Sequence, residues 1–345
     1  TSILESEKPP MEGRIWYNYA GQSRTDVQGD LADPSVVARV VEDENGALTT
    51  QAYRYEHNTL GNLTKSIDPL GRETLIEYAT NGIDVLSIKQ RTGGTEAAPI
   101  YATLASYTYN PADPAHRPRT YTDGSGNTTT FSYTPEGQIQ TVINELNEII
   151  TFTYVTNVSN NGYGKVLSIT GDVPGGNVSY TYDSFDRIRT ATDSEGHTLT
   201  YDYDALDRVT VITYPDSSYQ QFDYEDHSLV ASRDREGRWT RTFHNALRQP
   251  VLERDPLGQL TQYEWCRCGH IRKLIDGEGN ITHWIRDLQG RVTAKEMADG
   301  TRTDYTYHSS SGQLHTVTDA LDQVASRSYF VDGNLAEIDY SAANT

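Results

Sequence analysis

The sequence predicts an all-β fold, built as a repeat array of about 14 β-hairpin units with a period of about 21 residues. The first observation is the period itself, because an apolar residue follows a turn every 20 to 22 residues in the second half of the chain. These marker positions are Ile188, Val209, Leu229, Val251, Ile271, Val292, Leu314 and Leu335. The second observation is a recurrent Tyr-x-Tyr pair, and the third is a turn of the form Asp-x-x-Gly. A repeat this regular predicts a stack of equivalent units.

Each unit is expected to contain two short strands and two turns. Residues two apart share a face of a strand, so a pair such as Tyr201 and Tyr203 lies on one face. Asp and Gly are favoured at the first and fourth positions of a type I turn. Seven turns fit strictly, starting at Asp43, Asp68, Asp123, Asp193, Asp234, Asp255 and Asp276. Residues 246–248 and 287–290 look briefly helical, but both fall where a turn belongs, so no helix is predicted.

The array is expected to form one continuous domain. Residues 1–12 show no repeat and are interpreted as an irregular lead-in, and residues 13–345 as a single array. The array is irregular, with long loops, over residues 13–165, and regular over 166–345. Extended loops are expected at the segments rich in Gly, Pro and Asn, at 93–99, 111–114 and 157–164. We expect unpaired strand edges at both ends of the array.

Several phrases of the sequence resemble the YD-repeat, or RHS-repeat, family. They are Tyr182-Asp183-Ser184-Phe185-Asp186-Arg187-Ile188, Tyr203-Asp204-Ala205-Leu206-Asp207-Arg208-Val209, Asp68-Pro69-Leu70-Gly71-Arg72 and Asp276-Gly277-Glu278-Gly279-Asn280. The resemblance covers nearly the whole chain. Relatives include the shells of bacterial RHS and Tc toxins and the teneurin barrel. The resemblance therefore implies a curved, spiralling β-strip or a hollow shell.

Composition excludes several classes of protein. The net charge of −19 argues against a nucleic-acid partner. No run of 18 apolar residues occurs, so no membrane insertion is expected. The chain has 24 Tyr but only 12 Phe, Met and Trp together, which suits strands that are wet on one side. Because Thr1 is not preceded by a signal peptide, we expect an excised or processed piece of a larger protein.

The most unusual turn is Cys266-Arg267-Cys268-Gly269-His270. In register, Cys266 stands where Asp204 stands, and Cys268 where Leu206 stands. Two thiols and an imidazole suit zinc, but a structural site is usually closed by four ligands. A disulfide between residues two apart closes a small, strained ring. We therefore expect a packed, non-ligating turn, with a metal site and a redox pair as the alternatives.

No catalytic residue, cofactor or metal ligand is predicted, and the chain is not expected to be an enzyme. The acidic turns at 123–127 and 276–280 do not repeat the ligand spacing of a calcium loop, and turn formation already accounts for them. Ser and His show no repeated relation. Asp-Pro-Leu-Gly at 68–71 and 255–258 resembles part of the self-cleavage core of toxin shells, but both copies sit in ordinary repeat turns.

Aromatic residues of successive repeats form a candidate ligand-facing ladder of Tyr263, Trp265, Trp284, Tyr305 and Tyr307. Such a row can stack on sugar rings. It is also what cross-strand aromatic stabilisation of a sheet produces, and the structural interpretation is favoured.

The sequence thus predicts a non-catalytic structural scaffold, a segment of a shell that encloses or displays a cargo domain outside this chain. Its expected partners are a protein cargo or neighbouring copies of itself, and its expected location is extracellular or on a bacterial cell surface. The alternative is an extracellular adhesion or carbohydrate-binding module, with a cell-surface glycan as partner, that assembles end to end through its strand edges.

Overall fold

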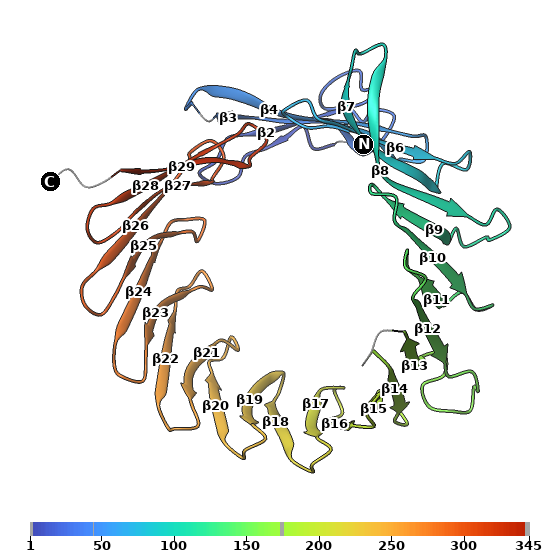
Figure 1. Cartoon of the computed structure of the whole chain (residues 1–345). Coiled ribbons are helices and arrows are strands. Elements are labelled where there is room, and N and C mark those ends of the chain that lie inside the picture. The colour runs from blue at the N-terminus through green and yellow to red at the C-terminus, as the bar shows by residue number, and fades with distance from the viewer. Residues whose placement is uncertain (1–2, 44, 173–175, 342–345) are drawn as a thin grey trace. The chain divides into compact units, whose positions relative to one another are not determined.

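The chain is a series of antiparallel hairpins (Figure 1). The computed structural model describes residues 3–43, 45–172 and 176–341. These residues form 29 strands and no helix. The predicted all-β hairpin array is therefore confirmed. Residues 1–2 of the expected lead-in and 342–345 of the expected array lie outside the described residues. No helix within the described part is long and apolar enough to cross a membrane.

The chain divides into two compact units. Unit 1 comprises Thr1–His116, Thr122–Gly126 and Thr282–Thr345, and unit 2 comprises Arg117–Tyr121 and Asn127–Ile281. The strands at the N-terminal side of unit 1 are β1 (Ser6–Glu7), β2 (Ile15–Tyr19), β3 (Pro34–Glu42), β4 (Leu48–His57), β5 (Leu63–Ile67), β6 (Glu73–Tyr78), β7 (Val85–Gly94) and β8 (Pro99–Tyr109). Its C-terminal strands are β25 (Val292–Glu296), β26 (Arg302–Tyr307), β27 (Leu314–Thr318), β28 (Val324–Tyr329) and β29 (Leu335–Ser341).

Unit 2 holds the regular middle of the array. Its strands are β10 (Thr128–Tyr133), β11 (Ile139–Ile143), β12 (Ile149–Tyr154), β13 (Val166–Gly171), β14 (Val178–Tyr182), β15 (Ile188–Asp193), β16 (Thr198–Tyr203), β17 (Val209–Thr213), β18 (Tyr219–Glu225), β19 (Ser228–Arg233), β20 (Trp239–His244), β21 (Pro250–Arg254), β22 (Leu260–Trp265) and β23 (Ile271–Ile275). The boundaries between the units fall in β9 (Pro118–Asp123) and at the first residue of β24 (Ile281–Arg286). Within unit 2, each strand pairs antiparallel with the next strand of the chain.

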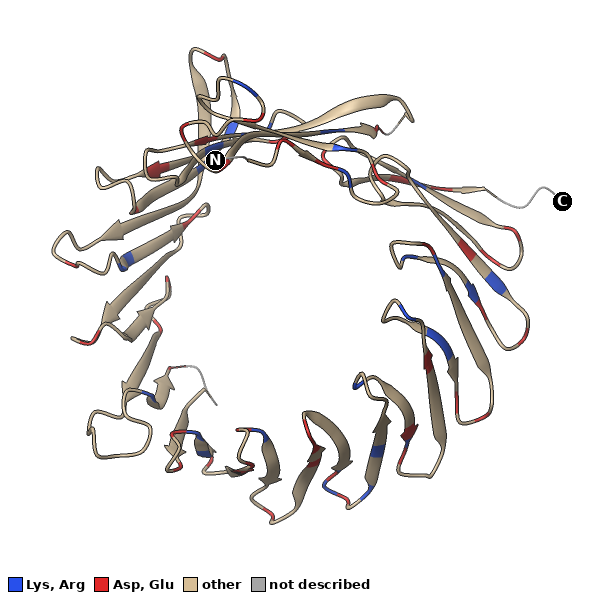
Figure 2. Ribbon diagram, turned by 180° about the vertical axis from the view of Figure 1, so that it is seen from behind, with Lys and Arg blue, Asp and Glu red and all other residues tan. Residues whose placement is uncertain are grey.

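The predicted Asp-x-x-Gly segments form turns with the hydrogen bonds expected of them. In all seven Asp-x-x-Gly turns, the glycine N–H donates to the aspartate carbonyl. The side chain of the first residue also accepts from the chain: Asp204 Oδ1 takes the N–H groups of Leu206 at 2.8 Å and Arg208 at 3.1 Å. The fourth residue is left-handed, and Asp207 has a φ of 62° where other turns use glycine. Figure 2 shows many of the acidic residues in such turns.

A β-bulge recurs at the end of the second strand of the unit, and the sequence did not predict it. In the pairing of β16 with β17, the register shifts between Asp202 and Tyr203. The same shift occurs before Tyr182, Tyr224 and Trp265. A bulge changes the direction of the side chain that follows it. The aromatic side chain after each shift therefore points in a different direction from the one it would have in a regular strand.

Within each unit, no second layer of described residues covers the strands. Among the described residues, the buried apolar positions are Tyr19, Val41, Ala105, Val155 and Ala294, and no large side chain is fully enclosed. The accessible surface is 21163 Å², whereas a compact monomer of this mass exposes about 14,000 Å². Stability therefore comes from contacts between neighbouring hairpins, without one central core.

Candidate functional site

The most regular feature of the array is a hydrogen bond that closes the open end of a hairpin. Tyr203, the last residue of β16, donates its hydroxyl to the carbonyl of Ile188 at 2.7 Å. The same bond, which we call the tyrosine stitch, joins Tyr19 to Leu4, Tyr78 to Leu63, Tyr133 to Pro118, Tyr154 to Ile139, Tyr182 to Val166, Tyr307 to Val292 and Tyr329 to Leu314. Three of these acceptors, Ile188, Val292 and Leu314, are apolar marker positions that define the period. In these hairpins, the second tyrosine of the pair is the donor and the marker residue is the acceptor of the same hydrogen bond.

In three repeats, an arginine at the fifth turn position contacts an aromatic residue at the stitch position of the next hairpin. The Arg187 guanidinium binds Asp183 of its own turn at 2.7 Å and donates to the carbonyl of Asp204, in the next turn on that side, at 2.9 Å. Its centre lies 4.6 Å from the ring of Tyr203, which adds a cation–π contact. Hydrogen bonding to Arg187 lowers the pKa of the Asp183 carboxyl despite its partial burial. Arg208 and Arg291 stack in the same way on Tyr224 and Tyr307.

Distant segments of the chain meet inside unit 1. Gly13 donates its N–H to the carbonyl of Ser310 at 2.8 Å, and Gln51 Nε2 donates to the carbonyl of Val331 at 2.6 Å. The largely buried carboxylate of Asp332 pairs with Arg72 at 2.5 Å. We call this set of contacts between residues 10–72 and 289–333 the clasp; it also includes Tyr53 to Asp332 and His308 to Glu42. Figure 1 shows β2, β3 and β4 beside the C-terminal hairpins. The clasp joins side chains of β3 and β4 and nearby turns to turns of the last repeats, and it does not follow from the repeat pattern.

The structure gives two of the five candidate ligand-facing aromatics a stitching role. Trp265 replaces tyrosine and donates Nε1–H to the carbonyl of Pro250 at 2.6 Å, and Tyr307 forms the stitch to Val292. Trp284 has the Lys295 ammonium 6.0 Å from its ring. Tyr263, Trp265, Trp284, Tyr305 and Tyr307 are all half-buried, and burial raises the pKa of Tyr263 and of Tyr307. Their proposed contact with a ligand stays a prediction.

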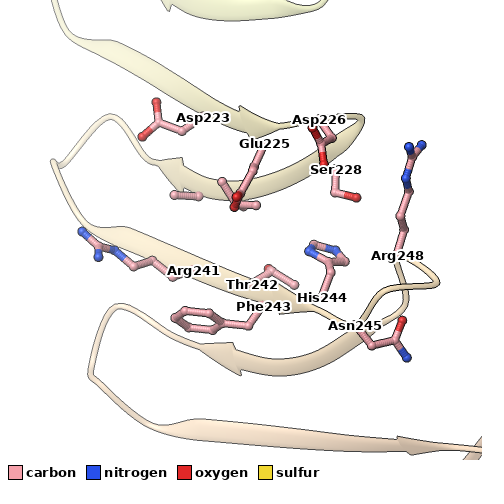
Figure 3. A pocket seen from close by; sticks show the side chains of 12 residues that line it. Asp223, Glu225, Asp226, Ser228, Arg241, Thr242, Phe243, His244, Asn245 and Arg248 are labelled. Atoms are coloured by element: carbon pink, nitrogen blue, oxygen red, sulfur yellow. The ribbon is translucent and has the colours of Figure 1, made fainter.

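A pocket of about 560 Å³ lies elsewhere, where one repeat lacks its Tyr pair. In register, Thr242 and His244 of β20 replace Tyr201 and Tyr203, and both line the pocket. Smaller side chains leave space beside the neighbouring hairpin β18–β19. Figure 3 shows Asp223, Glu225 and Asp226 on one side of this space and Arg241, His244 and Arg248 on the other.

His244 makes this pocket chemically distinct from the rest of the sheet. Its Nδ1 atom is buried and has no hydrogen-bond partner among the described residues. The candidate aromatic ladder from Tyr263 to Tyr307 does not line this pocket. The absence of a Tyr pair at Thr242 and His244 is, however, visible in the sequence. The gap in the repeat was the signal that could have found it.

The sequence analysis favours a packed, non-ligating cysteine turn, with a metal site and a redox pair as the alternatives. The structure joins Cys266 to Cys268 in a disulfide, and the Cα atoms are 5.1 Å apart. Cys268 and His270 are exposed, and Cys266 is half-buried. The turn brings the two residues close, because the N–H of the third residue donates to the side chain of the first, as it does in the turns that start at Asp183 and Asp204.

Comparison with known proteins supports the repeat assignment. Residues 182–219 match the family model described as RHS Repeat. The structure of the Tc holotoxin pore from Photorhabdus luminescens aligns with a TM-score of 0.71 at 14% identity, over 89% of this chain and 18% of that one. The crystal structure of TcdB2-TccC3 aligns with a TM-score of 0.72 at 14% identity, over 92% of this chain and 19% of that one. The chain therefore shares the fold of a minor part of much longer chains. No curated protein sequence matches it.

Proposed function

We propose that this chain, which carries an RHS repeat at residues 182–219 and the fold seen in Tc toxin structures, is a wall segment of a protein shell. Its role is structural and non-catalytic, and the shell encloses or displays a cargo domain that lies outside residues 1–345. The observation that carries the proposal is the single uncovered layer of stitched hairpins. A layer with two accessible faces suits a wall, since one face can line a cavity while the other meets solvent.

The energetics of the array also suit a wall. Many hairpins are closed by a stitch, and arginines such as Arg187 tie one hairpin to the next, so the sheet can extend without a growing core. The toxin resemblance suggests an extracellular or cell-surface location as part of a larger secreted protein, with a protein cargo as partner.

The alternative is an adhesion or carbohydrate-binding module that assembles end to end. The pocket at Thr242 and His244 favours binding of a polar ligand. The clasp argues against simple end-to-end growth, because residues 10–13 already lie against turns of the last repeats.

Electron microscopy of the purified chain at several concentrations, with light scattering for mass, tests the proposal. We expect particles of one size whose mass stays that of a monomer or a fixed oligomer. Filaments that lengthen with concentration would overturn the shell in favour of end-to-end assembly. Saturable binding on a glycan array that is lost in His244→Ala would favour the adhesion module.

A further inference from the structure

The turn at residues 266–270 repeats the backbone of the aspartate turns with a different set of side chains. The N–H of Cys266 donates to the carbonyl of His270 at 2.9 Å, and the N–H of Gly269 to the carbonyl of Cys266 at 3.1 Å. The corresponding bonds of the turn that starts at Asp204 measure 3.0 and 3.3 Å. The local frame is therefore the same, and only the groups that it displays have changed.

The first sulfur occupies the place of a carboxylate oxygen. Cys266 Sγ accepts the N–H of Cys268 at 3.1 Å and the N–H of His270 at 3.4 Å, as Asp204 Oδ1 accepts from Leu206 and Arg208. Two backbone N–H groups thus hold Cys266 Sγ at the mouth of the turn.

The fifth position brings a third ligand atom to the same place. In the aspartate turns this residue folds back on the first, as Arg208 Nε does on Asp204 Oδ2 at 2.8 Å. His270 holds that position here. The Sγ atoms of Cys266 and Cys268 and a ring nitrogen of His270 all lie within 4.8 Å of one another. Ligand atoms around a tetrahedral zinc ion are separated by roughly 3.5 to 3.8 Å, which small side-chain rotations reach from this arrangement.

We propose that the reduced form of this turn binds one zinc ion through Cys266 Sγ, Cys268 Sγ and the imidazole of His270. Two thiolates and one imidazole are a soft donor set that zinc prefers to harder cations. Two thiolates also neutralise the ion, and the chain's net charge of −19 favours cation uptake. Because Cys268 and His270 are exposed, the fourth coordination position stays open to solvent.

The disulfide is the closed state of this site, since sulfurs bonded to each other do not ligate as thiolates. A dithiol reductant supplies two electrons and two protons to the two sulfurs and becomes a disulfide itself. Zinc then displaces the two thiol protons as it binds. The redox state of the turn therefore decides whether the site exists.

The chain contains its own comparison turn. Residues 193–197 place Asp193, Glu195 and His197 at the first, third and fifth positions of the same frame. His197 Nδ1 lies 3.2 Å from Asp193 Oδ2 and 3.5 Å from Glu195 Oε2. The double substitution Cys266→Asp with Cys268→Glu gives the cysteine turn this same set of first, third and fifth residues. It keeps the turn-forming acceptor at position 266 and removes both sulfurs.

Zinc titration of the whole chain against a chromophoric chelator tests the proposal. The protein is reduced, freed of reductant without oxygen, and compared with its oxidised form. We expect one chelator-resistant zinc ion per reduced chain, none in the oxidised chain, and loss of that ion in the double variant. A cadmium titration should give a thiolate-to-metal absorption band in the reduced wild type only.

His270→Arg, which restores the arginine found at position 208, should weaken zinc binding while the far-ultraviolet circular dichroism stays unchanged. The proposal is overturned if the reduced wild type competes for no zinc, or if the double variant retains the same ion. Undiminished binding in His270→Arg would remove the imidazole from the ligand set and overturn the site as stated.

Discussion

The hydroxyl of Tyr203 donates a 2.7 Å hydrogen bond to the carbonyl of Ile188, which lies 15 residues earlier at the start of the same hairpin. Because the register shifts between Asp202 and Tyr203, the ring turns toward the hairpin's open end, where the carbonyl of Ile188 accepts. The stitch therefore depends on a bulge as well as on a tyrosine. The stitch requires a nearly constant hairpin length, since a longer hairpin would carry the hydroxyl past its acceptor, and the tyrosine lies 15 residues after its acceptor in most stitched hairpins.

Removing a single stitch should weaken the array by a small and local amount. We expect Tyr203→Phe to lower the free energy of unfolding by about 0.5–1.5 kcal/mol. The value should fall near the lower end, because Ile188 is 36% exposed and water can reach its carbonyl. Urea denaturation measures the change. Tyr201→Phe is the control, since no hydroxyl hydrogen bond of Tyr201 is found within the described residues. Equal losses in the two variants would contradict a specific role for the stitch.

Features that depend on residues within one repeat could be predicted from the sequence. The period, the Asp-x-x-Gly turns and the absence of helix in the described chain all follow from residues within about 20 positions of each other. The sequence identifies both partners of the stitch, the Tyr pair and the marker residue. It does not predict the hydrogen bond between them, because that bond depends on the bulge. Nothing in the spacing of Asp202 and Tyr203 distinguishes a bulge from a regular strand.

Contacts between distant repeats could not be predicted in the same way. Gly13, Gln51 and Asp332 belong to ordinary-looking turns and strands, and only the folded chain brings them together. The disulfide of the cysteine turn could not be predicted for a different reason. The sequence places Cys266 at the position of an aspartate and leaves a redox pair as one alternative, but it does not show that the turn brings its first and third residues close enough for a disulfide.

Half-buried tyrosines make the array sensitive to alkali. Burial is the main cause that raises the pKa of the Tyr154, Tyr182, Tyr203 and Tyr307 hydroxyls in the folded chain. A raised folded pKa means that the folded state holds its proton more tightly than the unfolded state does. This contribution is complete below the ordinary tyrosine pKa of about 10 and is lost as pH rises through the folded values.

The expected result is a urea midpoint that falls above about pH 10. Absorbance of tyrosinate should rise in two phases, with the exposed tyrosines ionising first. Tyr17, whose hydrogen bond to Glu7 raises its pKa to about 12, should ionise in the later phase. A single-phase titration with an unchanged midpoint would contradict the shifts.

Gly13 should be intolerant of any side chain because of the clasp. A Cβ atom at residue 13 would lie 2.9 Å from the carbonyl oxygen of Ser310 and 3.2 Å from that of Val40. Both are backbone atoms, so the segment has to move away and its hydrogen bond to Ser310 lengthens. We expect Gly13→Ala to destabilise unit 1 by roughly 1–3 kcal/mol. Faster amide exchange at residues 11–13 and 308–312 should accompany the loss.

Gly93→Ala is the matched control for the clasp. A Cβ atom at residue 93 meets nothing within 4 Å, and the backbone there is not left-handed. This variant should keep both the stability and the exchange rates of the wild type. If Gly13→Ala behaves like Gly93→Ala, the clasp does not hold the N-terminal segment in solution.

Restoring the missing tyrosine should stabilise the repeat that contains the pocket. His244 occupies the stitch position, and the marker residue 15 positions before it is Leu229. In His244→Tyr, the new ring fills part of the 560 Å³ pocket, and its hydroxyl can reach the carbonyl of Leu229 as Tyr203 reaches that of Ile188. The change also removes the buried Nδ1 atom that lacks a partner.

We expect His244→Tyr to raise the free energy of unfolding by about 1 kcal/mol, measured by urea denaturation. His244→Phe fills the same space without a hydroxyl, so the difference between the two variants isolates the stitch. A tyrosine variant less stable than wild type would mean that the histidine makes a contact in solution that outweighs both gains.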